Sequence, residues 1–382
     1  MDRNSTVPIG KRLEHFVRHL RPHLNPHYRK AYSSLLARGM GEQLNGETIV
    51  CCDFSNPAID SVGGRYYFSI VRDLIDAGYF PVFTARRATL STFGTSAMKS
   101  PLLTERLGVV RSLDELTQPY FLITDGDAPA PPNTLGVIRM SYERRRSQGK
   151  NELEFPVFVH PWLTTKIKFP YIYDLNAIRP VRLFFGGNTE EGKYDKDILR
   201  DLYSMLTRRE MLTVTRAEFT EAEIHRPRDA SRWLPSRDVQ RFVLCETQHC
   251  KIPQERWLDA LAKSDFFLAC PGVGMPLCHN LIEALAAGCI PILQYANYLP
   301  NSLEDRVNCL TFNNNEELKI AIRLAQSMSS HEIRILRKNV KQYYDDFLAP
   351  GRFTQRMFNG ETNQITLLMN AYRVPRSSSR TW

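Results

Sequence analysis

The chain has 382 residues, of which 43% are hydrophobic and 24% are charged, a globular composition that excludes an intrinsically disordered protein. Its length is enough for two domains of ordinary size. No apolar run reaches the roughly 18–20 residues that a membrane-spanning helix needs, and the polar N-terminus lacks the apolar core of a secretory signal, so we expect a cytoplasmic protein.

The net charge of +9 is concentrated at the two ends of the chain. Residues 1–40 carry a net charge of +6 and residues 360–382 a net charge of +2, which leaves +1 for the central body. A nucleic-acid enzyme is expected to carry basic side chains along its working groove. Basic ends on a nearly neutral body fit either attachment to an anionic membrane surface or two solvated tails, and both interpretations stay open.

The first half of the chain alternates apolar runs with amphipathic stretches. An interrupted helical pattern covers 11–38, and a helical face over 65–78 ends at Gly78. The strand–helix–strand order around this second helix favours a parallel sheet. Short apolar runs predict its strands at 47–53, 79–84, 119–125, 136–140 and 155–160.

A second α/β series begins after a break near residue 178. Its predicted helices follow the sequences DKDILRDLYSML, PQERWLDALAKS and MPLCHNLIEALAAG. Its predicted strands are VRLFFGGN, MLTVTR, RFVLCE, DFFLACPG and CIPILQ. Two such series imply two doubly wound domains, with ligands at the carboxyl ends of their strands and a cleft between them.

The most informative segment is 264–295. A strand stops at Pro271, and Gly272 and Gly274 let the backbone pass close to a ligand. A helix then starts near Met275, and its free N–H groups can bind phosphate oxygens. Glu283 lies about two turns into that helix, where a carboxylate can accept hydrogen bonds from both hydroxyls of a ribose.

This segment resembles the C-terminal domain of GT-B glycosyltransferases, and most closely that of the exostosin-like group. The resemblance is carried by Pro271-Gly272, Glu283-Ala284 and Gly288-Cys289-Ile290-Pro291, and residues 339–358 are similar to the terminal helices that cross back to the first domain in this class. It implies that Glu283 binds ribose and that the loop Gly272-Val273-Gly274 binds a diphosphate. The pattern covers 180–358.

The resemblance gives the expected organisation of the chain and its departures from the family. Cys278, His279 and Asn280 stand where the group usually has Ser and Arg, so His279 and Asn280 are the candidates for meeting the donor. The second Glu of one retaining group is replaced by Met275.

We expect a basic helical extension at 1–45, an acceptor domain at 46–178, a nucleotide-sugar domain at 179–340, cross-over helices at 341–360 and a tail at 361–382.

Acids at the carboxyl ends of strands are the candidates for the catalytic base. Asp125 follows the strand at 119–125, and Asp60 lies in the loop after the first strand; either can deprotonate an acceptor hydroxyl, and loop capping is the alternative for both. Asp125-Gly126-Asp127 also matches the metal-binding DxD of GT-A enzymes, but its place in the first unit of a two-unit chain disfavours a metal.

Basic and glycine residues near two helix starts are further candidates for the donor site. Gly64 and Arg65 begin a helix and can approach a phosphate. Basic residues often face the leaving diphosphate in GT-B enzymes, and basic residues also follow the FFGGN strand of this chain. The alternative is that they lie on a solvent-exposed helix face. With Gly186 of that strand, the candidates are Lys193, Lys196 and Arg200.

The cysteine and histidine residues of the chain do not predict a metal site, and no motif predicts a bound cofactor. Cys245, His249 and Cys250 lack the further ligands that a closed zinc site needs, and the other cysteines lie mostly in apolar runs. His160 is expected to be structural. Leu277 takes the place of the third glycine of a dinucleotide-binding GxGxxG, which argues against a dehydrogenase.

The sequence therefore predicts a glycosyltransferase that needs no cofactor. It moves a sugar from a nucleotide-sugar donor, expected to be UDP-linked, to a hydroxyl of a glycan or lipid-linked glycan in polysaccharide synthesis. The expected location is the cytoplasm or the cytoplasmic face of a membrane, with no nucleic-acid partner. The alternatives are a nucleotide-sugar epimerase of the same fold and a non-catalytic sugar- or partner-binding protein.

Overall fold

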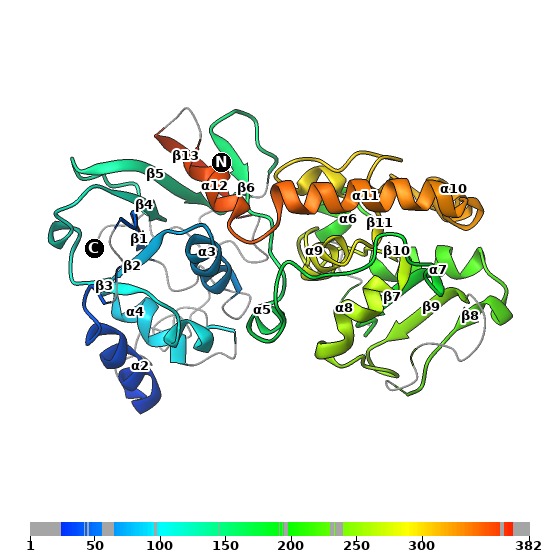
Figure 1. The fold of residues 1–382 in the computed structure, drawn as a ribbon, viewed down its shortest axis with the longest axis horizontal. Helices are drawn as coiled ribbons and strands as arrows, with labels where there is room; N and C mark the ends of the chain where they lie inside the picture. Colours follow the sequence, from blue (N-terminus) through cyan, green and yellow to red (C-terminus); the bar gives the residue numbers. More distant parts are fainter. Residues whose placement is uncertain are drawn as a thin grey trace, which may run out of the picture.

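The chain folds into two α/β halves that lie side by side (Figure 1). The computed structural model describes residues 24–41, 43, 46–55, 65–94, 98–143, 145–190, 192, 194, 198–229, 233, 240–359 and 363–369. Each half contains one sheet, and all the pairings between strands in both sheets are parallel.

The first sheet has the strand order β3-β2-β1-β4-β5-β13-β6. Its central strands are apolar on both faces and almost fully buried, as expected for a parallel sheet between helices. The strands are β1 Ile49–Asp53, β2 Phe80–Thr84, β3 Gly108–Val110, β4 Tyr120–Thr124, β5 Thr134–Ser141, β6 Glu152–Glu154 and β13 Gln364–Leu368. The helices of this half are α2 Pro26–Leu36, α3 Arg65–Asp76, α4 Arg87–Leu90 and α5 Pro161–Lys166.

The second sheet has the strand order β12-β11-β10-β7-β9-β8. Because the chain moves from β7 outward to β8 and β9 and then returns to β10, the topological switch point lies between β7 and β10. The strands are β7 Val181–Gly187, β8 Ile224–His225, β9 Gln240–Glu246, β10 Ser264–Leu268, β11 Ile290–Leu293 and β12 Leu310–Thr311. The helices are α6 Ile198–Tyr203, α7 Arg208–Ala217, α8 Gln254–Ala262, α9 His279–Ala286, α10 Asn315–Ser327 and α11 Ser330–Phe347.

The chain returns to the first half at its C-terminal end. Helix α11 runs along the second half, and α12 (Arg352–Phe358) and β13 then pack in the first half (Figure 1). The buried carboxylate of Asp73 on α3 accepts hydrogen bonds from the backbone N–H groups of Gly351 and Thr354, both at 2.8 Å, and from the Thr354 hydroxyl at 2.7 Å. Two Rossmann-like halves joined by a returning helix are the GT-B architecture that the sequence predicted.

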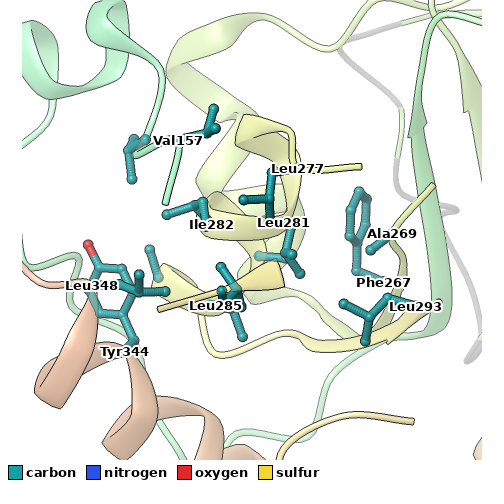
Figure 2. Close-up of a cluster of buried hydrophobic side chains, with 14 of the residues drawn as sticks. Val157, Phe267, Ala269, Leu277, Leu281, Ile282, Leu285, Leu293, Tyr344 and Leu348 are labelled. Atoms are coloured by element: carbon teal, nitrogen blue, oxygen red, sulfur yellow. The ribbon is translucent and has the colours of Figure 1, made fainter. Parts of the chain in front are cut away.

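Helix α9 lies at the centre of the hydrophobic core of the second half. Figure 2 shows Leu281, Ile282 and Leu285 of α9 packed among side chains of neighbouring segments, including Phe267 of β10 and Tyr344 of α11. All but one residue of α9 is buried. The backbone of this helix is therefore held rigidly at the edge where the two halves meet.

The helix α9 begins at His279 and not near Met275, so Glu283 lies about one turn into it and not two. Three further sequence-based assignments were wrong. The segment MLTVTR is not a strand but part of α7, because Thr207 and Glu210 form a capping box and Met211, Leu212 and Thr215 make a helical buried face. Residues 155–160 do not continue β6, since Pro156 cannot donate to a ladder and Val157 has a positive φ of 53°.

The third error concerns the tail at 361–382. Residues 364–368 of this interval form β13, which pairs with both β5 and β6 and buries Ile365, Leu367 and Leu368.

Most of the basic N-terminal extension and the last residues of the chain lie outside the described ranges. Among the helices that the structure describes, none combines the length and the apolar character needed to cross a bilayer.

Candidate active site

A cavity of about 810 Å³ opens at the carboxyl ends of β7, β9 and β10, at the switch point of the second sheet. The start of α3 and the segment 157–163 close it from the first half. Its volume lies in the range typical of cofactor and substrate sites, roughly 300–1,000 Å³. The lining residues are Arg65, Tyr66, Val157, His160, Leu163, Gly186, Gly187, Asn188, Tyr194, Arg208, Cys245, Thr247, Cys250, Lys251, Ile252, Gln254, Trp257, Gly272, Val273, Gly274, Met275, Leu277, Cys278, His279, Asn280 and Glu283.

The loop between β10 and α9 forms one wall of this cavity. It turns back on itself through a hydrogen bond from the Gly272 N–H to the Pro276 carbonyl at 3.2 Å. A Cβ atom on Gly272 would lie 2.8 Å from the Met275 carbonyl oxygen, so the turn requires glycine. Cys278 occupies the N-cap position of α9, and Cys278, His279 and Asn280 at the start of the helix line the cavity.

Glu283 is the carboxylate of this wall, and it is only 2% exposed. Its Oε1 accepts a hydrogen bond from the His160 backbone N–H at 3.1 Å, and its Oε2 accepts one from Trp257 Nε1 at 2.6 Å. Burial raises the pKa of Glu283 to about 7, because neither partner is a cation that would offset the loss of solvent. The group therefore exchanges its proton near neutral pH.

The ring of Trp257 lines the cavity next to Glu283. A Cβ atom on Gly186 would lie 2.6 Å from the Trp257 ring, so glycine near the end of β7 lets the indole approach the strand closely. Asn280 donates a hydrogen bond from Nδ2 to the Gly186 carbonyl at 3.2 Å. Gly186, Asn280, Trp257 and Glu283 thus tie β7, α8 and α9 together at the cavity.

Arg208 supplies a buried cation where the loops after β7 and β10 meet. Its Nη1 donates to the Asn188 carbonyl at 2.7 Å and its Nη2 to the Pro271 carbonyl at 3.2 Å. The guanidinium lies 3.8 Å from the centroid of the Tyr194 ring, a cation–π arrangement that holds its plane. This is the first residue of α7, and it is 6% exposed.

The first half contributes Arg65, Tyr66 and His160. The Tyr66 hydroxyl contacts Met275 Sδ at 3.4 Å, and the His160 ring contacts the His279 ring with 5.1 Å between centroids. Burial, with a smaller contribution from the Arg65 charge, lowers the pKa of His160 to about 4. Both imidazoles are therefore held neutral at physiological pH, since burial and then Arg65 also hold the pKa of His279 well below its ordinary value.

Three lining side chains keep a buried nitrogen without a hydrogen-bond partner in the part of the chain that the structure describes. These nitrogens are Nε of Arg65, Nε of Arg208 and Nε2 of His279. A buried polar atom that makes no hydrogen bond costs roughly 1–3 kcal/mol. All three side chains line the cavity, but these particular atoms are inaccessible to solvent and therefore lie inside its wall.

Most of the described residues that the sequence predicted for the donor site line this cavity. They are Arg65, Gly186, Gly272, Val273, Gly274, His279, Asn280 and Glu283. Arg200 is not among the lining residues and forms an ion pair with Glu210 on α7. Asp60, Gly64, Lys193 and Lys196 lie outside the described residues, so their roles stay predictions.

Asp125, the other predicted base, lies at the carboxyl end of β4 and does not line the cavity. Its Oδ1 accepts hydrogen bonds from the Ser55 backbone N–H at 2.7 Å and the Ser55 hydroxyl at 2.9 Å. The sequence favoured a structural role for His160, and its Nδ1 does cap α5 by accepting from the Trp162 N–H at 3.2 Å. His160 also lines the cavity.

Sequence analysis missed Arg208, Trp257 and Lys251. Arg208 was hidden because the segment after it was assigned to a strand, although the Thr207–Glu210 capping box was a readable signal for a helix start. Among the described residues, no three His, Cys, Asp or Glu side chains are grouped so that they could hold a metal ion.

Comparisons with known proteins give distant similarities to solved structures. No protein-family model matches the chain, and no curated protein matches it. A mutant form of the Thermobaculum terrenum O-GlcNAc transferase is similar in structure, with 12% sequence identity and a TM-score of 0.40, and the match covers 87% of this chain and 71% of that one. A similarity of this degree says nothing about the reaction of the present chain.

Proposed function

We propose that this protein is a glycosyltransferase that moves a sugar from a nucleotide diphosphate donor to a hydroxyl of an acceptor glycan. The observation that carries the proposal is the convergence of the Gly272–Gly274 loop, Arg208 and Glu283 on one cavity at the switch point of the second sheet. These are the three kinds of group that a nucleotide diphosphate needs. The first half faces them and leaves an acceptor a place to bind.

The diphosphate is proposed to lie between α9 and Arg208. Backbone N–H groups at the start of α9 can donate to phosphate oxygens, and the positive end of the helix dipole favours the negative charge. Arg208 uses one N–H of Nη1 and one N–H of Nη2 on two carbonyls, and each of these nitrogens has a second N–H that those two bonds do not use. A guanidinium is also the side chain best suited to two oxygens of one phosphate.

The ribose is proposed to bind Glu283. A carboxylate has about four sites for accepting hydrogen bonds, and the protein uses one on each oxygen. The two that remain can accept from the 2′ and 3′ hydroxyls. Because Trp257 and the His160 backbone fix the carboxylate, no side-chain freedom is lost when the ribose binds.

In the proposed transfer step, negative charge develops on the leaving diphosphate. The acceptor O–H bond breaks and its proton passes to a base or to solvent, the acceptor oxygen forms a bond to the anomeric carbon, and the bond from that carbon to the phosphate oxygen breaks with its electron pair leaving on the diphosphate. Arg208, Arg65 and the start of α9 stabilise this developing charge inside a partly enclosed site, where such interactions are strongest. Both halves must therefore be in place for the reaction.

We extend the proposal to a UDP-linked donor and to polysaccharide synthesis, as the resemblance of the segment 264–295 implies. The concentration of positive charge in residues 1–40 and 360–382 favours work at an anionic membrane face. An epimerase of the same fold would release an altered nucleotide sugar without an acceptor. A binding protein would show donor affinity and no turnover.

A thermal-shift panel of UDP-, GDP-, ADP- and CMP-sugars tests the proposal, followed by product analysis with glycan acceptors. A ligand present at about 100 times its Kd should stabilise the protein by about 2.7 kcal/mol, which is readily detected as a rise in Tm. The proposal predicts a shift with one nucleotide class and an acceptor-dependent release of its nucleoside diphosphate. No shift with any member of the panel would overturn it.

A further inference from the structure

We infer that the segment joining the two halves is part of a surface that binds an anionic lipid membrane. This segment, the linker strap (residues 167–178), connects α5 to β7 and belongs to neither sheet. The inference deepens one part of the proposed function, the work at an anionic membrane face, by naming the surface that meets the lipid. It does not depend on which nucleotide sugar the cavity binds.

Buried contacts hold the linker strap against the second half. Arg337 on α11 is 1% exposed, and its Nη1 donates to the carbonyls of Leu175 at 2.8 Å and Ala177 at 2.9 Å. The ring of Tyr173 packs at the end of α9, where a Cβ atom on Gly288 would lie 2.4 Å from it. The strap is therefore anchored along its length and presents a defined outer face.

The side chains of the linker strap alternate between the protein and solvent. Its odd-numbered residues are half-buried, and its even-numbered residues are exposed. The exposed set includes Ile172 and Ile178, each 88% exposed, the highest value of any large hydrophobic side chain in the described chain. Because the anchored backbone holds both isoleucines in water, a partner with an apolar interior would gain by covering them.

Four exposed cations accompany these isoleucines. Lys166 ends α5 and Lys168 lies at the start of the strap, while Arg334 and Lys338 are one turn apart on α11. None of the four makes an ion pair with an acid in the part of the chain that the structure covers. Their charge is therefore available to a partner.

The face of α11 that carries Arg334 and Lys338 adjoins the linker strap. Asp345 lies on the same helix face, seven residues after Lys338, and its charge acts on Tyr173 of the strap. Arg337, which bonds the strap directly, is one turn from Arg334. The isoleucines and the cations thus belong to one continuous region of the surface.

The acids near the linker strap leave most of this positive charge uncancelled. Asp345 is paired with Lys341, and Asp259, whose charge also acts on the strap, is paired with Lys263 at 2.9 Å. The exposed acid of the strap itself is Asp174, whose Oδ1 accepts from the Asn176 backbone N–H at 2.8 Å. Four unpaired cations against this one acid give the region a net charge of about +3.

An anionic membrane fits both features of this surface. Isoleucine side chains can enter the boundary of the acyl chains while the cations bind the charged head groups. A second copy of the chain fits less well, because it would bring two cationic faces together. Two isoleucines six positions apart also supply far less contact than the roughly 800 Å² per partner of a stable interface.

The test measures the partition of the full chain onto vesicles of phosphatidylcholine containing about 30% phosphatidylserine, by co-sedimentation. Replacing both isoleucines, with Ile172→Ser and Ile178→Ser, should lower the partition coefficient about tenfold because the apolar insertion is lost. Replacing Arg334 and Lys338 with Gln should lower it about fivefold for each charge removed. Vesicles of phosphatidylcholine alone should bind the wild-type protein more weakly than the mixed vesicles.

Two matched controls lie away from this surface. Ile320 on α10 is a 56% exposed isoleucine beside the Glu316–Lys319 ion pair, and Arg111 is an exposed cation of the first half. Ile320→Ser and Arg111→Gln should partition within about twofold of the wild type. All variants should keep the wild-type Tm, since every substituted side chain is exposed.

The remaining outcomes each decide against the inference or against the proposed function. Unchanged partition of the double isoleucine variant overturns the inference, and so does equal or absent binding of the wild type to both kinds of vesicle. Self-association of the wild type in analytical ultracentrifugation, abolished in that variant, would assign the surface to a second copy instead. The absence of any nucleotide-sugar shift would remove the transferase and leave the vesicle result standing.

Discussion

The carboxyl edges of the two sheets carry similar residues and use them differently. In the first sheet, Asp53 at the end of β1 accepts hydrogen bonds from Thr84 at 2.6 Å and from Arg86 at 2.5 and 2.8 Å. At the carboxyl edge of the second sheet, Glu283 on α9 accepts, among the described residues, from two neutral donors, Trp257 and the His160 backbone. One edge is closed by its own ion pair, and the other remains open to a ligand.

The ionisation of the two acids reflects this difference. Burial would raise the pKa of Asp53, but hydrogen bonds from Arg86 and Thr84 outweigh burial and leave the pKa below its ordinary value. With no such cation in hydrogen-bond contact, burial prevails at Glu283 and its pKa rises to about 7. A buried acid without a paired cation costs stability and is therefore a candidate for function. The comparison supports the proposal that the donor binds at the second edge.

The largest effect should come from removing Arg208. Replacing it with Gln keeps a hydrogen-bond donor for the Asn188 and Pro271 carbonyls but removes the charge that faces the diphosphate. We expect the affinity for a nucleotide sugar to fall by about 100-fold, since a hydrogen bond from a charged group is worth roughly 1.5–3 kcal/mol and charge neutralisation adds to it. Isothermal titration calorimetry measures this change.

Arg209→Gln is the control for that experiment, because Arg209 is the exposed neighbour of Arg208 on the same helix and does not line the cavity. Its affinity should stay within about twofold of the wild type. Equal losses in both variants would show that only the general positive charge of α7 matters. Arg208 would then have no specific role in binding the diphosphate.

A smaller effect should appear in the pH dependence of donor binding. Because the pKa of Glu283 is about 7, its carboxylate is mostly protonated at pH 6 and mostly ionised at pH 8. If the ribose requires the ionised form, affinity for a nucleotide sugar should rise by up to about tenfold over this interval. A nucleotide sugar is the right probe, since its diphosphate has no proton that titrates there. Glu283→Gln should bind weakly and without this dependence.

The same group makes a prediction for stability, with the sign fixed by linkage. Between the ordinary pKa of Glu and about 7, the folded protein keeps a proton that the unfolded chain has lost. The contribution of Glu283 to the free energy of unfolding therefore falls as pH rises through this window. Thermal unfolding of Glu283→Gln, compared with the wild type, should lose that component of the pH dependence. A steeper dependence in the variant would contradict the assignment.

The smallest effect is expected at the closed edge of the first sheet. Asp125→Asn should leave donor affinity within about twofold, because the Asp125 carboxylate is engaged by Ser55 and does not line the cavity. Calorimetry with the same nucleotide sugar checks this. A loss comparable with that of Arg208→Gln would show that the two edges share the donor, and the contrast between them would fail.

The sequence predicted the fold because parallel strands and their helices leave a periodic apolar pattern. It also predicted the loop at Gly272 and the acid at Glu283, since both lie in one continuous segment. Contacts between distant segments leave no such pattern. The Trp257 bond to Glu283 and the Phe158 bond to His279 join residues 26 and 121 positions apart, and neither could be inferred from spacing.

The error at α7 shows a different limit. Alternating Met211, Thr213 and Thr215 imitate a strand, while the capping box that begins with Thr207 starts a helix, and the helix places Arg208 at the cavity. Local propensity was outweighed by the cap and by packing of Met211 and Leu212 against the core. At Asp125 the sequence correctly predicted the end of a strand, but the partner that engages the carboxylate lies 70 positions away.

The most direct test of the central claim is a crystal structure of the protein with a bound nucleoside diphosphate. The account predicts phosphate oxygens between the first turn of α9 and the Arg208 guanidinium, with the ribose hydroxyls at the Glu283 carboxylate. Ligand density at the Asp53–Arg86 edge of the first sheet, with this cavity empty, would contradict it.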